Sequence, residues 1–381
     1  MKILVDGRFY GLEHAGIGRY SMNLIDELAK LDNKNQYVIL LNEKYYKLLN
    51  FPTNFKKVRA DFRHYTITEQ LHLPFIINRH KPDICHFLHF NVPVFYLGKF
   101  IVTLHDMEMH NSKGKETTTR DFFSYNLWRI GYKFIFLNAA LRAGKIIVPT
   151  DTVQKEISSY FKLNPEKFVV TYEGVDESFY KKVNTKTTNK ILAKFNLLGK
   201  KYFFYNGNAY PHKNLSRAID AIKQFNNSHD KTYFVIASSR SVFTQRLIDL
   251  IKTKNMIDLV KVVGFITDEE LKVLEQNSTA FVYPSLMEGF GIQGLEALAS
   301  GTLLVASNLA VFREIYNGHA IYFKPKSPHS IRIGLTSAYN LNLSERLFRI
   351  TNGIKYAKRF SWTKMAKKTL ALYIKYEENR T

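Results

Sequence analysis

The sequence is poor in cysteine, because its 381 residues include only one, Cys85. A single cysteine cannot form an internal disulfide, and its place in the apolar run 83–87 predicts an inert core thiol. We therefore expect a reducing, cytoplasmic setting. No apolar stretch approaches the roughly 20 residues that span a bilayer. Residues 1–7 lack the apolar core of a signal peptide, since Asp6 interrupts them.

Acidic residues are also scarce relative to basic ones. Lys and Arg number 55 against 33 Asp and Glu, which gives a net charge of +22. This balance favours anionic partners, which are nucleic acid, an acidic lipid surface or a phosphorylated substrate; a merely lysine-rich surface explains it equally well. The run 54–63 mixes basic and aromatic residues and predicts an exposed segment able to rest on an anionic membrane.

Short β-rich runs alternate with helical patterns along the whole chain, which predicts an α/β protein with parallel strands covered on both faces. The expected strands are Lys2–Val5, Tyr37–Leu41, Asp83–Phe87, Phe100–Leu104, Lys145–Val148 and Phe168–Tyr172, then Lys201–Tyr205, Thr232–Ala237, Val260–Val263, Ala280–Tyr283, Leu303–Ala306 and Ala320–Phe323. We predict two doubly wound, Rossmann-like domains, 1–182 and 183–361, which face each other across a cleft. The polar stretch Lys181–Thr188 is the expected seam, and the amphipathic helix of 362–381 is expected to pack back on the first domain.

Two glycine-containing loops follow predicted strands. Ala15-Gly16-Ile17-Gly18-Arg19-Tyr20 opens a helix, where glycines let phosphate oxygens approach backbone N–H groups. It is not a full G-x-G-x-x-G because its sixth place is Ser21, and a turn needed only for packing remains the alternative. The second loop runs from Tyr205 to Asn214 and places Lys213 at a helix start, where its charge can hold a diphosphate.

The most informative segment is 284–301, in which a strand ends, a glycine-rich loop follows and a helix starts near Gly291. Glu288 lies in the loop, and Glu296 lies about one and a half turns into the helix. Two carboxylates around a phosphate-binding helix start suit a diphosphate with a sugar at each end, because a carboxylate accepts both hydrogens of a diol. The alternative is that Glu296 is an ordinary surface residue, although its neighbours are apolar.

His105 follows a predicted strand at the edge where ligands should bind, and it can bond a sugar hydroxyl or transfer a proton. A lone histidine is more often structural, so His105 gains weight only beside the other motifs. The sequence contains no D-x-D triple and no Cys/His metal spacing. We therefore expect a mechanism without metal or cofactor, in which lysine and helix dipoles take the place of a cation.

Together these motifs resemble the family 4 glycosyltransferases, which are retaining enzymes of the GT-B fold. The resemblance covers nearly the whole chain, and its most specific part is the E-x7-E pattern from Glu288 to Glu296. The supporting matches are Ala15–Tyr20, Glu69-Gln70, His105-Asp106, Glu173–Asp176 and Gly207 through Lys213-Asn214. The form G-N-x-x-P-H-K-N is similar to the branch of bacterial-type mannosyltransferases.

By this resemblance Glu296 holds the ribose, Glu288 and the following backbone hold the hexose, and Lys213 with the Gly16 backbone holds the diphosphate. His105 would face the hexose and Ile266 the base. The implied substrate-binding residues are Gly16, Gly207, Asn208, Lys213, Ile266, Glu288, Gly289, Phe290, Gly291, Ile292 and Glu296, and His105, Glu288 and Lys213 are the implied catalytic ones. Asn208 departs from the family, which often has arginine there; Lys213 then carries more phosphate charge, or Arg240 helps.

The expected function is transfer of a hexose, with retention, from a nucleotide sugar to a glycan, glycoprotein or glycolipid acceptor. GDP-mannose is the first donor prediction. The alternatives are a UDP-sugar transferase of the same fold, a nucleotide-sugar epimerase, and a nucleic-acid-binding or nucleic-acid-modifying protein, which charge alone supports. Peripheral association with the cytoplasmic face of an anionic membrane and a homodimer are the remaining partner expectations.

Overall fold

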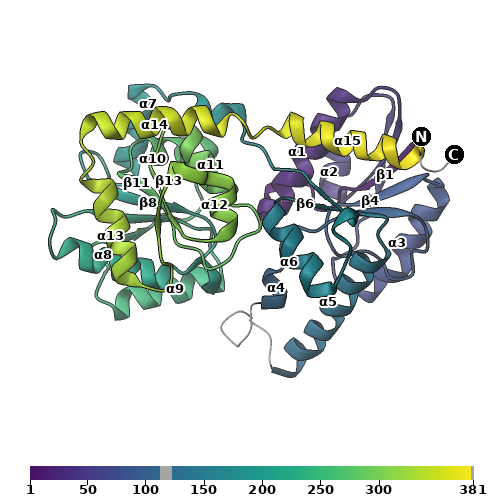
Figure 1. The fold of residues 1–381 in the computed structure, drawn as a ribbon, viewed down its shortest axis with the longest axis horizontal. Helices are drawn as coiled ribbons and strands as arrows, with labels where there is room; N and C mark the ends of the chain where they lie inside the picture. The colour runs from purple at the N-terminus through teal and green to yellow at the C-terminus, as the bar shows by residue number, and fades with distance from the viewer. Residues whose placement is uncertain (112–121, 379–381) are drawn as a thin grey trace. The chain divides into compact units, whose positions relative to one another are not determined.

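The computed structural model describes residues 1–111 and 122–378. These residues form two compact units. The first comprises Met1–His110, the described part of Arg120–Gly174 and the described part of Ser361–Thr381; the second comprises Val175–Phe360. Each unit holds one parallel sheet between helices (Figure 1).

The first sheet has the strand order β3-β2-β1-β4-β5-β6-β7 in the described residues, and every neighbouring pair is parallel. Its strands are β1 (Lys2–Asp6), β2 (Gln36–Leu41), β3 (Phe55–Arg59), β4 (Ile84–Phe87), β5 (Phe100–Thr103), β6 (Lys145–Val148) and β7 (Phe168–Val170). The chain winds outward in both directions from the β1–β4 pair. In such sheets the carboxyl ends of the strands at this reversal are where ligands bind.

The second sheet repeats this plan with the order β10-β9-β8-β11-β12-β13 among the described residues. Its strands are β8 (Tyr202–Asn206), β9 (Tyr233–Ala237), β10 (Val260–Val262), β11 (Ala280–Tyr283), β12 (Leu304–Ser307) and β13 (Ala320–Phe323). Here the reversal lies between β8 and β11. The prediction of two doubly wound, Rossmann-like domains is therefore confirmed.

Helices cover both faces of each sheet. Those of the first unit are α1 (Ala15–Leu31), α2 (Glu43–Leu48), α3 (Ile67–His80), α4 (Glu108–Asn111), α5 (Phe122–Arg142), α6 (Asp151–Phe161) and α15 (Trp362–Glu378). Those of the second are α7 (Thr185–Lys194), α8 (Leu215–Asn226), α9 (Val242–Thr253), α10 (Asp268–Gln276), α11 (Ile292–Ala299), α12 (Ala310–Tyr316), α13 (Pro328–Tyr339) and α14 (Leu343–Ala357). Among the described residues, no helix combines the length and apolar character that crossing a membrane requires.

The C-terminal helix α15 packs beside α1 in the first unit (Figure 1), where Thr363 donates to Glu27 at 2.6 Å. Helices α3, α5 and α6 cover the opposite face of the same sheet and share one apolar core with it. Cys85 lies in this core, and burial raises the pKa of its thiol to about 12. It is the inert core thiol that the sequence predicts.

Two segments differ from the sequence prediction. The basic run 54–63 contains the edge strand β3, where Lys57 donates to two backbone carbonyls and Arg59 pairs with Glu43. Charged residues on an edge strand hide the apolar pattern by which a strand is identified in sequence, and they discourage pairing with other chains. The stretch 181–188 is no linker, because α7 begins at Thr185 behind its cap Asn184. The unit boundary falls after Gly174, inside the segment assigned to the first domain.

Candidate functional site

The carboxyl ends of β8 and β11 are joined by hydrogen bonds between the loops that follow them. Leu286 N donates to His212 O at 2.7 Å. Asn214 adopts a left-handed conformation, with φ 60°, and its Nδ2 donates to the carbonyls of Pro284 and Pro325 at 2.9 and 2.8 Å. Asparagine tolerates this conformation better than most residues. Asn214 thus fixes the loop that carries Lys213, a role that its place in the motif did not reveal.

Lys213 and Glu288 meet at this edge. The ammonium Nζ lies 2.7 Å from Oε1 of Glu288, and both side chains are nearly buried, with 10% and 12% exposure. Ser285 donates to the same carboxylate oxygen at 2.6 Å. Among the described residues, Oε1 of Glu288 is the one hydrogen-bond acceptor of the Lys213 ammonium. An ammonium has three donors, so Lys213 retains capacity for an anion.

Helix α11 begins at this edge in an unusual way. Its N-cap is Gly291, at φ 91°, and a Cβ there would lie 2.4 Å from the Tyr316 hydroxyl and 2.7 Å from the Phe312 ring. Tyr316 also donates to Gly291 O at 2.5 Å. Glycine is therefore needed both for conformation and for packing against α12. The first N–H groups of α11, which lack acceptors in a preceding turn, follow directly on the loop that holds Glu288.

The remaining residues of this segment are well covered. Gly289 and Phe290 are buried, Ile292 is 8% exposed, and the Phe290 ring packs edge-on against Phe360. Glu296 is 2% exposed, so it is not the ordinary surface residue of the alternative interpretation. A buried carboxylate on the first turns of a helix needs polar partners, which suits a role in binding hydroxyls.

Three buried phenols lie near enough to Glu288 for its charge to act on them. Burial, reinforced by the charge of Glu288, raises the pKa of Tyr205, Tyr283 and Tyr316 well above the usual value. They therefore stay protonated and act as donors. Tyr205 donates to Asn208 O at 2.8 Å, which fixes the exposed Asn208 beside Gly207.

Two further loops complete the edge. Gly207 has φ 147°, which glycine alone adopts readily, and it follows β8 directly. Ile266 is half-buried in the loop after β10, just before the capping box of α10. Arg240 is exposed in the loop after β9. All these loops follow the carboxyl ends of neighbouring strands, so the second unit gathers most of the predicted donor residues at one edge.

The first unit carries the other two predicted residues, and its glycines have different roles. A Cβ on Gly18 would lie 1.8 Å from Gly11 O, so Gly18 is required for packing. Gly16 is exposed, and a Cβ there would meet nothing within 4 Å. The packing explanation thus applies to Gly18 and leaves Gly16 open to a ligand.

His105 follows β5 and is held by neighbours on three elements. Its Nε2 donates to Leu88 O at 3.0 Å, and its ring packs edge-on against Tyr20 at 4.8 Å. Its Nδ1 lies 3.9 Å from Oε1 of Glu173. With Nε2 donating, the neutral ring carries its lone pair on Nδ1, which is the nitrogen available to accept a proton.

A buried ion cluster, which the sequence analysis did not assign, lies at the reversal point of the first sheet. Arg8 is 1% exposed and donates to both oxygens of Asp6 at 2.7 Å and to Glu69 at 2.6 Å. Burial alone would raise the pKa of Glu69, but contacts with His64, Arg8 and Asn91 lower it to about 2. The only signal in the sequence was Glu69 itself, as part of a family match.

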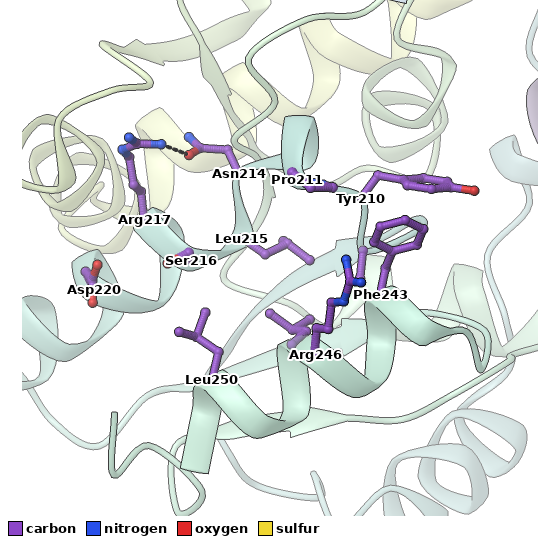
Figure 2. Close-up of a pocket in the computed structure, with 12 residues that line it drawn as sticks. Tyr210, Pro211, Asn214, Leu215, Ser216, Arg217, Asp220, Phe243, Arg246 and Leu250 are labelled. Atoms are coloured by element: carbon purple, nitrogen blue, oxygen red, sulfur yellow. Dashed lines mark hydrogen bonds between the residues drawn. The ribbon is translucent and has the colours of Figure 1, made fainter. Parts of the chain in front are cut away.

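A separate pocket of about 780 Å³ lies between α8 and α9, and none of the predicted donor residues lines it. Figure 2 shows Tyr210 beside Phe243, with ring centroids 4.3 Å apart, and Arg246 below them. The pocket shares the loop of Lys213 but does not include the Lys213–Glu288 pair.

Comparison with known proteins agrees with this arrangement. The model of "Glycosyl transferases group 1" matches residues 187–355, and that of "Glycosyltransferase Family 4" matches residues 14–179. The O-antigen chain mannosyltransferase RfbU of Salmonella typhimurium is 27% identical over 53% of this chain and 53% of its own length. O-antigen chain mannosyltransferase B of Escherichia coli is 24% identical over 94% of this chain and 95% of its own.

Among solved structures, Anabaena HepE in complex with UDP and glucose superposes with a TM-score of 0.76 at 16% identity, over 98% of this chain and 100% of that one. This likeness bears on the fold alone. The two family matches together account for both units. The chain therefore belongs to the family 4 glycosyltransferases of the GT-B fold, on the branch of its mannosyltransferase relatives.

Proposed function

We propose that this glycosyltransferase moves mannose from GDP-mannose to a hydroxyl of a glycan or glycolipid acceptor, with retention and without a metal ion. The observation that carries the proposal is the Lys213–Glu288 pair at the carboxyl edge of β8 and β11. The names of the mannosyltransferase relatives support mannose as the transferred sugar.

The pair suits a sugar diphosphate for a geometric reason. A cation binds the phosphate, and a carboxylate binds sugar hydroxyls. Because Nζ and Oε1 lie 2.7 Å apart, the ligand groups that they contact must be neighbours in the donor. The hexose and the diphosphate meet at the glycosidic C–O bond, which is the bond that transfer breaks.

The proposed reaction needs no carboxylate nucleophile. The bond between the anomeric carbon and the phosphate oxygen breaks as the acceptor oxygen bonds to that carbon on the same face, and the departing phosphate takes the acceptor proton. Lys213 and the N–H groups at the start of α11 stabilise charge on the leaving phosphate. Retention follows because attack and departure use one face. A product of inverted configuration, or a covalent sugar on Glu288, would refute this mechanism.

A panel of GDP-, UDP- and ADP-sugars, tested by calorimetry and thermal shift with a chelator present, examines the donor. GDP-mannose should bind most tightly and raise the melting temperature. Tight binding of UDP-sugars without GDP-mannose would replace the donor with a UDP-sugar. If no nucleotide sugar binds, the proposed function fails.

Two glutamate variants test the division of the site. Charge-assisted hydrogen bonds contribute about 1.5–3 kcal/mol each, so Glu296→Ala should weaken GDP and GDP-mannose alike. Glu288→Ala should weaken GDP-mannose and leave GDP nearly unchanged. Glu269→Ala, which alters an exposed carboxylate on α10, is the matched control. Equal losses of GDP affinity in the Glu288 and Glu296 variants would contradict these roles.

Product analysis separates the remaining alternatives. A transferase gives GDP and a mannosylated acceptor, whereas an epimerase gives a changed donor and needs no acceptor. A nucleic-acid-binding protein would bind duplex DNA with an affinity that falls steeply as salt rises.

A further inference from the structure

Helix α5 exposes a regular row of large apolar side chains. The row follows the spacing i, i+3, i+7, which places its members on one side of a helix. Its members are Leu127, Ile130, Phe134, Leu137 and Leu141, with exposures of 64, 67, 58, 37 and 53%. The opposite side of α5 packs in the core through Tyr132, Phe136, Ala139 and Ala140. The helix is therefore apolar on both sides, which its structural role does not require.

Two neighbouring elements expose similar side chains. Helix α3 presents Ile67, Leu71 and Phe75, at 80, 54 and 67% exposure. The loop between β4 and β5 presents Phe95 and Leu97, at 61 and 85%. Single exposed apolar residues are common, but ten on adjoining elements are not.

Hydrogen bonds hold these elements side by side. Gln70 of α3 accepts from Val94 N at 2.8 Å. At the far end of α5, the Arg142 guanidinium donates to the carbonyls of Val94 and Tyr96. The loop is thus fixed between α3 and α5, both of which cover the same face of the first sheet (Figure 1). We call the ten exposed residues on α3, the loop and α5 the apolar face.

The charges beside the apolar face are of one sign. Within residues 67–80, 93–100 and 122–142, Arg79, Lys99 and Lys133 are exposed. The other two basic residues, Arg129 and Arg142, are half-buried and donate to backbone carbonyls. The one carboxylate in these stretches is Glu69, which is buried and paired with Arg8. Exposed cations around an apolar surface are complementary to acidic lipid headgroups.

We propose that the apolar face docks on an anionic membrane, with its large side chains in the headgroup–acyl boundary and its cations at the lipid phosphates. The charge favours this occupant over a second copy of the chain, because two faces with three exposed cations each, on chains with a net charge of +22, would repel. The face spreads over two helices and a loop, which fits a planar surface better than a single helical seam. The proposal is independent of the donor, since docking needs no nucleotide sugar.

Vesicle flotation of the full chain tests the proposal. The vesicles contain phosphatidylcholine alone or with about 30% phosphatidylglycerol. The test variant is Ile130→Ser/Phe134→Ser/Leu141→Ser. The matched control is Leu343→Ser/Leu347→Ser/Phe348→Ser, which alters equally exposed residues on α14 of the second unit. Circular dichroism verifies that both variants fold.

The wild type and the control should bind the anionic vesicles, and the test variant should lose at least about tenfold in partitioning, since each large side chain contributes over a kilocalorie. Lys99→Glu/Lys133→Glu should lower binding to the anionic vesicles more than binding to the vesicles of phosphatidylcholine alone. The proposal is overturned if the wild type binds no vesicles, or if both triple variants lose equally. It is also overturned if light scattering shows a dimer that only the test variant dissociates, while vesicles stay unbound.

Discussion

The Lys213–Glu288 pair predicts a stability effect that is separable from ligand binding. Both groups are nearly buried and 2.7 Å apart, so removing either leaves the other as an unpaired charge in a poorly hydrated site. Such a loss costs about 3–5 kcal/mol, and we expect the lower value because each side chain keeps some exposure. Lys213→Met and Glu288→Gln should each lower the melting temperature of the second unit by about 6–12 °C.

The assay uses the position of the two tryptophans. Trp128 and Trp362 both lie in the first unit, so tryptophan fluorescence follows that unit alone. Calorimetry follows the whole chain. In both single variants the fluorescence transition should stay in place, while the transition of the second unit moves down.

The double variant Lys213→Met/Glu288→Gln decides whether the two charges are coupled. Removing both leaves no unpaired charge, so its loss should be smaller than the sum of the single losses by about 1–3 kcal/mol. Strictly additive losses would show that the two groups act independently. Unchanged melting temperatures in the single variants would show that both charges are fully solvated. The proposal that Lys213 and Glu288 contact neighbouring groups of the donor would then lose its basis.

Three further predictions concern the first unit. Gly16→Ala should stabilise α1 by about 0.5–1 kcal/mol, yet it should lower transferase activity if the Gly16 backbone binds the diphosphate. Gly18→Ala should instead destabilise the first unit in thermal unfolding. A Gly16→Ala variant that is stable and fully active would exclude a ligand close to this backbone. Cys85 should react with a thiol reagent only after unfolding. Burial lowers the pKa of His86 to about 3 and contacts lower that of Glu69 to about 2, so the unfolded chain binds more protons below pH ~6.5. Stability followed by tryptophan fluorescence in urea should therefore be full above pH ~6.5. Below that pH, protonation of His86 in the unfolded chain should lower it by up to about 1.4 kcal/mol per pH unit, and Glu69 should add a similar slope only below pH ~4.5; a constant midpoint would contradict this.

The fold was largely predictable because the strands of buried parallel sheets are continuous apolar runs. The exception was β3, an edge strand whose Lys56, Lys57 and Arg59 remove the apolar signal. The unit boundary was missed for a related reason. A polar stretch at 181–188 looks like a linker in sequence, but it is the capped start of α7, and capping residues are polar by necessity.

The sequence was enough to predict which loops form the candidate site, but not which side chains in those loops contact each other. The order of strands brings 207–213 and 284–291 to one edge, which the alternation of elements already implied. The 2.7 Å contact of Lys213 with Glu288, and the contribution of Ser285 to it, depend on side-chain positions that no spacing encodes. The same holds for Asn214, whose two carbonyl partners come from loops distant in sequence.

The two sheets differ at their equivalent edges, and this difference supports the proposal that the donor binds the second unit. In the first unit the cation at the reversal point is Arg8, which is 1% exposed and already bonded to Asp6 and Glu69. Two carboxylates balance its charge and its side chain is buried, so it has little capacity left for a phosphate. In the second unit Lys213 meets one carboxylate and keeps donors for an anion. We therefore expect nucleotide affinity to depend on Lys213, whereas Arg8→Met should abolish folding of the first unit rather than weaken GDP. A folded Arg8→Met variant with reduced GDP affinity would refute this division.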